Sequence, residues 1–234
     1  MRTRYSVLII AMMLTGVILS FGQGTVVVND PTKTAVATKL SKTDEAIFNK
    51  ALPHVRKQLT SDVCDESVEV AGVMHGAFSK TGAKQTLVFY QYCQTGNGLG
   101  QVGLVLIENA KVIGNYVSDG GWSVDIATVS DINQNGLDEF ILSFSGGLHQ
   151  GQGGIGVDLM EFSGNAPKGI GWYRAEEILD TESTSVWKLT AKPGRAPVFY
   201  RQKYAATGNN KWKVVGRSTK YTLGKAYSKF TEVK

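Results

Sequence analysis

Cysteine and histidine are both scarce in this 234-residue chain, which holds two cysteines and three histidines. His54, His75 and His149 are widely separated and form no H-E-x-x-H motif, so the sequence disfavours transition-metal catalysis. The G-x-S-x-G elbow typical of many serine hydrolases is also missing. The glycine-rich stretch 146–156 lacks the Lys-[Ser/Thr] pair of a P-loop, so it does not predict a phosphate cradle.

Long apolar runs are missing after the first two dozen residues. The longest run, Val7–Phe21, has about 15 residues, whereas roughly 20 are needed to span the hydrocarbon core of a bilayer. Two arginines precede it, and Ser20 and Gly22 occupy the small-residue positions of a cleavage site, as in a secretory signal peptide. We therefore expect residues 1–22 to be a signal peptide and the protein to be secreted or periplasmic. An uncleaved signal that anchors the chain in a membrane is the alternative.

The two cysteines, Cys64 and Cys93, are expected to form a disulfide, because an isolated pair in an oxidising compartment is more often bridged than free. Closing that loop would stabilise the fold by about 3–4 kcal/mol in the chain-entropy model. Two separately buried thiols are the alternative, and they require Cα atoms more than about 7 Å apart.

Charge is unevenly distributed along the chain. Residues 105–185 hold 12 acidic and three basic side chains, whereas residues 186–234 hold 12 basic side chains and only Glu232 as an acid. Aromatic residues alternate with these cations, which suits an anionic or sugar-bearing surface. We expect an anionic envelope polymer or a protein partner on this basic third, and no nucleic acid for an exported protein. Strands with aromatics facing inward and cations facing solvent would produce the same pattern.

One helix is predicted near the N-terminus. After a polar linker or loosely held first strand at 23–42, apolar residues recur every four positions over 43–60: Ile47, Ala51, Val55 and Leu59. Thr43 with the acidic Asp44 and Glu45 predicts the N-cap and first turn. Pro53 predicts a kink or a later start of the helix.

From Val68 onward the chain consists of short β-branched and aromatic segments separated by Gly, Asn and Asp. Three stretches repeat the same order of predicted strands and turns. This weak repeat predicts β-meander units at 68–118, 123–162 and 186–223. Residues 173–185 interrupt this rhythm as an acidic connector that the sequence allows to be helical. We expect residues 43–234 to form a single, mainly β, antiparallel domain, arranged as a partial or open propeller-like assembly or as a sandwich.

One short motif suggests metal chemistry. Within residues 131–139, oxygen-bearing side chains occupy alternate positions and Gly136 permits a tight turn: Asp131, Asn133, Asn135 and Glu139. Hard cations such as Ca²⁺ bind oxygen ligands of this kind. An EF-hand is excluded, because the twelfth position of the loop is Leu142 rather than Glu.

The motif resembles the calcium loop of FG-GAP and VCBS-type β-propeller repeats. That resemblance covers about 14 residues and implies side-chain ligands from Asp131, Asn133, Asn135 and Glu139, with the backbone carbonyl of Leu137. Asp138 would then point outward or act through a water. The alternative is a metal-free β-turn, since Asn-Gly between apolar strands is a strong hairpin signal.

The glycine-dense loop between the strands at 139–145 and 156–162 provides further candidates, His149, Gln150 and Gln152, for contacts with a ligand. A flexible hairpin tip is the alternative. Together these features predict an exported, non-catalytic binding or scaffold module with one Ca²⁺-stabilised loop. A secreted hydrolase of polysaccharide or peptide with a structural cation is the alternative, and it would use a carboxylate pair such as Asp119 with Asp125 or Glu176 with Glu177.

Overall fold

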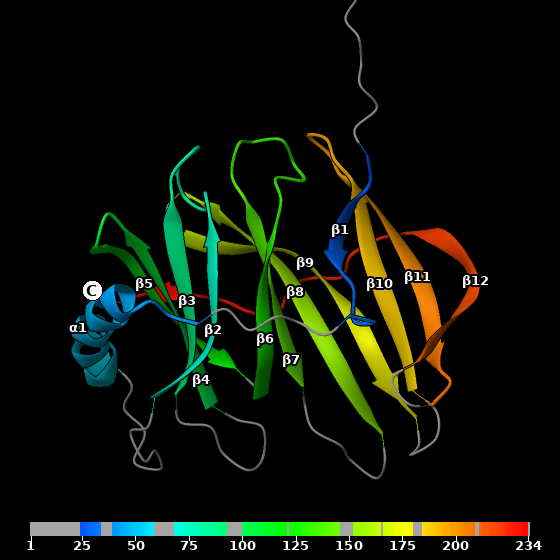
Figure 1. Ribbon diagram of the computed structural model, residues 1–234, viewed down its shortest axis with the longest axis horizontal. Helices are drawn as coiled ribbons and strands as arrows, with labels where there is room; N and C mark the ends of the chain where they lie inside the picture. The colour runs from blue at the N-terminus through cyan, green and yellow to red at the C-terminus, as the bar shows by residue number, and fades with distance from the viewer. Residues whose placement is uncertain are drawn as a thin grey trace, which may run out of the picture.

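The computed structural model describes residues 24–33, 39–58, 68–92, 100–120, 122–145, 152–164, 166–179, 184–208 and 211–233. Strands dominate, every strand pairing within the two sheets is antiparallel, and one α-helix is present in this described part (Figure 1). The prediction of a mainly β, antiparallel fold with one N-terminal helix is therefore confirmed.

The first sheet has five strands in the order β13-β5-β4-β3-β2. Their bounds are β2 (Val68–Gly76), β3 (Gln85–Tyr92), β4 (Gly100–Glu108), β5 (Lys111–Gly120) and β13 (Thr231–Glu232). The apolar residues of β3 and β4 alternate between two hydrophobic clusters, one shared with the helix and one shared with the second sheet. Because both faces are covered, these strands are almost continuously apolar in sequence.

The helix α1 (Lys42–Gln58) covers one face of this sheet. Its N-cap is Ser41 rather than the predicted Thr43, since the Ser41 hydroxyl accepts a hydrogen bond from the backbone N–H of Asp44 at 3.1 Å. Phe48 is buried against Tyr90, with ring centroids 5.5 Å apart. The helix begins at Lys42 and continues past position 53, so it does not start near the proline.

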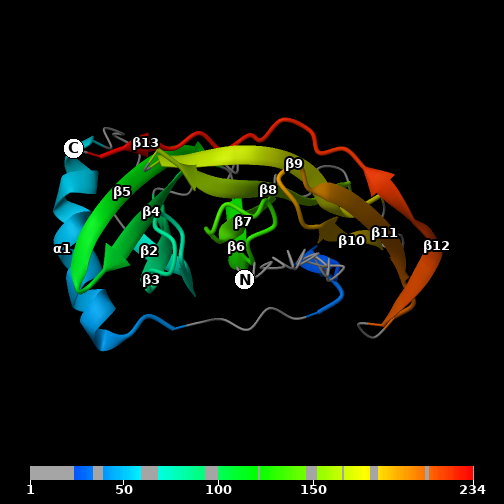
Figure 2. The same ribbon diagram turned by 90° about the horizontal axis from the view of Figure 1, so that it is seen from above.

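The second sheet has the order β12-β11-β10-β9-β8-β7-β6, with β1 (Val26–Asn29) added beside β10. The other bounds are β6 (Trp122–Val129), β7 (Glu139–Ser145), β8 (Gly153–Ser163), β9 (Ala166–Ile178), β10 (Thr184–Lys192), β11 (Val198–Ala206) and β12 (Trp212–Tyr221). Viewed from above, this sheet curls like half a barrel, with β1 on its inner side (Figure 2). One of its faces packs on the first sheet at β7 and β8.

Two details of the predicted organisation are corrected. Residues 173–178 extend strand β9 instead of forming a helical connector, and Tyr173 and Ala175 are buried on either side of the exposed Arg174. This alternation has period two, as expected for a strand. Because β9 pairs with both β8 and β10, the predicted units 123–162 and 186–223 form one continuous sheet. Residues 23–42, predicted as a linker or a loosely held first strand, contain the strand β1, in agreement with the second alternative.

The C-terminal segment crosses the outer side of the curled sheet and returns to the first sheet (Figure 2). Gly224 forms a two-way backbone bridge with Trp172, and β13 pairs with β5. Midway, the carboxylate of Asp158 accepts hydrogen bonds from the backbone N–H groups of Tyr227 and Ser228, the shortest at 2.7 Å. The segment therefore connects the two sheets through backbone hydrogen bonds.

Candidate functional site

The loop that joins β6 to β7 has the compact form that its sequence predicts. The carboxylate of Asp131 accepts hydrogen bonds from the backbone N–H groups of Asn135, at 3.0 Å, and Gly136, at 2.8 Å. The side-chain oxygen of Asn135 accepts the N–H of Leu137 at 2.8 Å. Gly136 has a φ of 85°, a conformation that glycine adopts without strain. Alternate side chains therefore turn inward over residues 131–136.

Glu139 closes the loop from the first position of β7. It is 1% exposed, and its Oε2 atom accepts the backbone N–H of Ile132 at 2.9 Å. Its Oε1 atom is also buried but has no hydrogen-bond partner in the described part of the chain. Burial raises the pKa of this carboxyl to about 7, and the negative charges of Asp131 and Glu161 raise it further against the effect of the Ile132 hydrogen bond.

Glu161 is a member of this cluster that sequence reasoning missed. It lies on β8, and its Oε2 atom accepts a hydrogen bond from the Asn133 side-chain amide at 2.8 Å. No local motif marks it, because only the pairing of β7 with β8 brings residue 161 near the loop. The one sequence feature that could have indicated Glu161 is its position as an acidic residue in the predicted strand that follows the one after the loop.

The side-chain oxygens of Asp131, Asn133, Asn135 and Glu139 therefore all accept backbone N–H groups of the loop, and metal binding by these residues stays a prediction. Within the described residues, no three or more His, Cys, Asp or Glu side chains are spaced to hold a metal ion. Asp131, Glu139 and Glu161 do not form such a cluster, and the loop's other two candidate side-chain ligands, Asn133 and Asn135, are amides.

Asp138 is directed away from the loop, towards the first sheet. Its Oδ2 atom accepts the backbone N–H of Ala77 at 2.8 Å, and its own N–H donates to the Ala77 carbonyl at 3.0 Å. Ala77 follows β2, so Asp138 ties the loop to the first sheet. Thr81, in the same turn, lies against Gly136, where an added Cβ would be 2.8 Å from its hydroxyl oxygen.

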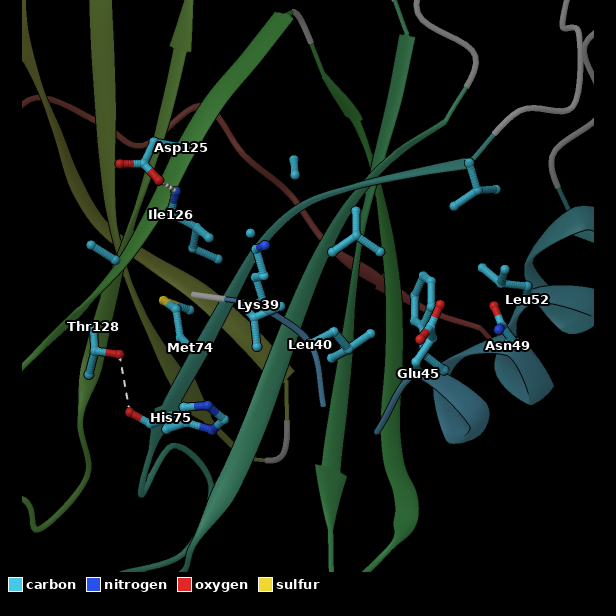
Figure 3. A pocket seen from close by; sticks show the side chains of 17 residues that line it. Lys39, Leu40, Glu45, Asn49, Leu52, Met74, His75, Asp125, Ile126 and Thr128 are labelled. Atoms are coloured by element: carbon cyan, nitrogen blue, oxygen red, sulfur yellow. Dashed lines mark hydrogen bonds between the residues drawn. The ribbon is translucent and has the colours of Figure 1, made fainter. Parts of the chain in front are cut away.

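A cavity of about 890 Å³ lies between β2, β6 and α1 (Figure 3). Its walls combine apolar side chains such as Met74 and Ile126 with four ionisable ones, Lys39, Glu45, His75 and Asp125. Burial raises the pKa of Asp125, whose Oδ1 atom accepts its neighbour's N–H at 2.7 Å. Asp125 and Glu45 come from opposite ends of the cavity (Figure 3), so they do not form the close carboxylate pair that a glycosidase needs.

Basic side chains are concentrated at the far end of the second sheet. Strands β10, β11 and β12 contain seven lysines and arginines and no acidic residue. The guanidinium of Arg201 lies 4.4 Å from the ring centroid of Tyr221 and 5.3 Å from that of Trp187. Trp187 pairs with Lys203 in the sheet register, so aromatic and cationic side chains share one face here instead of facing opposite ways.

Four of the predicted residues lie outside the described part of the chain: Cys64, Cys93, His149 and Gln150. The disulfide therefore stays a prediction. Gln152 is described, and it is an exposed residue at the rim of a second pocket.

A scan against protein-family models gives no match for this chain, and searches of curated proteins and of solved structures give none either. The resemblance of residues 129–142 to the FG-GAP and VCBS calcium loops therefore stays a prediction. Among the described residues, no helix has both the length and the apolar character required to cross a membrane. Function is inferred from the chain's own residues.

Proposed function

We propose that the protein is an exported, non-catalytic binding module whose 131–139 loop is stabilised by one Ca²⁺ ion. The observation that carries this proposal is the Oε1 atom of Glu139, a carboxylate oxygen that is buried and has no partner within the described chain. Burying a charged oxygen without a partner is costly unless a cation or a hydrogen-bond donor compensates it. A divalent cation beside Glu139 would supply that compensation.

The neighbouring groups favour a hard cation. Asp131 and Glu161 are close enough to Glu139 for their negative charges to raise its pKa, so both carboxylates repel the charged form of Glu139. Asn133 and Asn135 add neutral oxygens, and the Leu137 carbonyl completes the set that the motif implies. Ca²⁺ takes about six to eight oxygens in a flexible geometry, which suits such a mixed set better than the regular octahedron of Mg²⁺.

The basic end of the second sheet is the proposed binding surface for an anionic envelope polymer. The seven lysines and arginines of β10, β11 and β12 have no acidic side chain on their own strands, and among the described residues one of them, Lys188, forms an ion pair, with Asp30. A surface of one charge sign attracts polymers of the opposite sign over a Debye length of about 10 Å. Export to the periplasm or the exterior belongs to the same proposal.

A secreted hydrolase is the second candidate, and one observation favours it. Asp125 has a raised pKa and lines the cavity at β2, β6 and α1, which is where a general acid would be sought. Turnover of a polysaccharide or peptide that Asp125→Asn abolishes would establish it. The binding module predicts no such turnover.

The Ca²⁺ site is tested by unfolding the mature protein in EDTA and in millimolar Ca²⁺. At one hundred times the dissociation constant, bound Ca²⁺ should raise the free energy of unfolding by about 2.7 kcal/mol. Glu139→Gln keeps an oxygen that can accept the Ile132 N–H but removes the charge, so it should abolish the rise, as should Asp131→Ala.

Asp119→Asn is the matched control, because it removes an exposed carboxylate that lies outside the loop and should leave the Ca²⁺ response unchanged. Identical unfolding of the unmodified protein in both solutions would remove the metal site and leave a hydrogen-bonded turn.

A further inference from the structure

A pocket of about 440 Å³ opens on the outer side of the curled sheet, where β8, β9 and the C-terminal segment meet. Part of its wall is bare backbone, contributed by Gly153, Gly154 and Gly156. A side chain at Gly156 is excluded, since a Cβ there would lie 2.6 Å from Nε1 of Trp172 and 2.8 Å from the Phe144 ring. The pocket therefore presents flat backbone beside aromatic rings.

Three aromatic rings form the other wall. Tyr227 stands nearly perpendicular to Trp172, with centroids 5.3 Å apart, and to Phe144, with centroids 5.9 Å apart. Its backbone N–H is held by both oxygens of Asp158, at 3.1 Å each. Nevertheless Tyr227 is 65% exposed. A ring that is fixed in place and still exposed can be covered by a ligand with little further loss of entropy.

Trp172 contributes an unused hydrogen-bond donor. Its indole Nε1 is buried and has no partner within the described chain, although buried indole N–H groups usually find one. Trp172 lines the pocket, and its Nε1 lies close to Gly156, where the aromatic wall meets the glycine wall. An oxygen of a ligand seated against this wall would be the acceptor that the chain itself does not provide.

The polar rim is neutral in total charge. Arg174 and Glu177 form an ion pair of 2.5 Å, and Gln152 is exposed beside them. Guanidinium, carboxylate and amide groups are planar and can each make two hydrogen bonds, which suits adjacent hydroxyl groups. A paired Arg and Glu do not favour an anion or a cation. The exposed Leu179 extends the apolar part of the pocket.

From these four features we infer that this pocket binds a neutral saccharide. The C–H face of a pyranose ring would lie on Tyr227 and Trp172, a ring or hydroxyl oxygen would accept the indole N–H, and the remaining hydroxyls would contact Arg174 and Glu177. The pocket shares no residue with the 131–139 loop or with strands β10, β11 and β12, so this inference does not depend on the proposed function. A proline-rich peptide, which also packs on aromatic rings, is a different ligand class that the experiment distinguishes.

The test uses the mature, full-length protein with three neutral hexasaccharides, built from glucose, mannose and N-acetylglucosamine. Binding is followed by tryptophan fluorescence and by calorimetry, in EDTA and again in Ca²⁺. At least one hexasaccharide should bind saturably. Tyr227→Ala and Trp172→Phe, which removes the indole N–H and keeps an aromatic ring, should each weaken its dissociation constant by about tenfold, or roughly 1.4 kcal/mol.

Ile113→Ala is the control, because it truncates an exposed apolar side chain of the first sheet that does not line the pocket, and it should leave the dissociation constant unchanged. Thermal unfolding of each variant shows whether it is folded before binding is compared, and Arg174→Gln repeats the test at an exposed rim position if Tyr227→Ala unfolds. Absence of saturable binding to all three sugars overturns the inference. So does binding that the pocket variants leave unchanged, or saturable binding of a decaproline peptide instead.

Discussion

Glu139 and Asp158 are both buried carboxylates of the second sheet, yet they differ in how their oxygens are used. Asp158 is 0% exposed, and both of its oxygens accept backbone N–H groups from the C-terminal segment. Glu139 is 1% exposed, but only Oε2 is paired, and its neighbours include two further carboxylates. A buried carboxylate stabilises a fold when both of its oxygens are paired. One with an unpaired oxygen lowers stability unless a cation or a hydrogen-bond donor from outside the chain compensates it.

The largest effect that this comparison predicts is at the paired carboxylate. Asp158→Ala removes the acceptor for Tyr227 and Ser228, and it should lower the free energy of unfolding by about 3 kcal/mol, because hydrogen bonds from two backbone N–H groups to a buried carboxylate are lost. Urea titration measures this change. Ser118→Ala is the control, since the Ser118 hydroxyl accepts one longer bond of 3.3 Å from Lys229 in the same segment. Equal losses in the two variants would contradict a special role for Asp158.

A somewhat smaller effect is expected when pH is changed in the absence of metal. The pKa of Glu139 in the fold is about 7, above the ordinary value of 4.5. The fold therefore holds the proton more tightly than the unfolded chain does, and this contribution to stability is complete below pH 4.5 and is lost as pH rises through 7. Between pH 5 and pH 8 in EDTA, the loss should be about 2 kcal/mol.

Glu139→Gln does not titrate, so it should lack this part of the pH dependence. The measurement is the difference between the two urea-unfolding curves at each pH, which cancels contributions from Asp125 and Glu176, whose pKa values are also raised by burial. Parallel pH profiles for the two proteins would show that Glu139 does not titrate in this range.

The smallest effect on stability is expected for exposed charges. Arg217→Glu combined with Lys220→Glu changes exposed residues of β12, so the free energy of unfolding should shift by less than about 0.5 kcal/mol. Binding to dextran sulfate at low salt should nevertheless weaken several-fold and should lose part of its salt dependence, while uncharged dextran serves as the control polymer. Unchanged binding to dextran sulfate would show that β12 is not part of the surface that binds the anionic polymer.

Much of the architecture was predictable because its signals are local. Alternating apolar residues predict the strands from Val68 onward, and the four-residue spacing predicts α1. The prediction failed at 173–178, where acidic residues near the end of β9 suggested a helix. This segment lies inside the sheet because Glu176 pairs with Val186. The sequence of residues 173–178 gave no sign of that pairing, because Val186 belongs to another strand, β10.

The loop at 131–139 also has one part that the sequence predicts and one part that depends on strand pairing. Its turn follows from the sequence alone, because Asp131, Asn133 and Asn135 bond to backbone N–H groups at most five residues away. The burial of Glu139 and the approach of Glu161 depend on how β7 pairs with β8. The sequence therefore predicted the turn of the loop but not the burial of Glu139 and the raised pKa that results from it.

By itself, the sequence determined the strand pattern, the turn at Asn135-Gly136 and the segregation of basic charge into the last third of the chain. Tertiary structure alone decided that Asp158 holds the C-terminal segment and that Tyr227 meets Trp172 beside bare glycine backbone. The physical reason is the separation in sequence between the residues that interact. Turns and periodicity arise from neighbours within a few residues, whereas burial and cross-strand contacts join distant residues, such as Asp158 and Ser228, which are 70 positions apart.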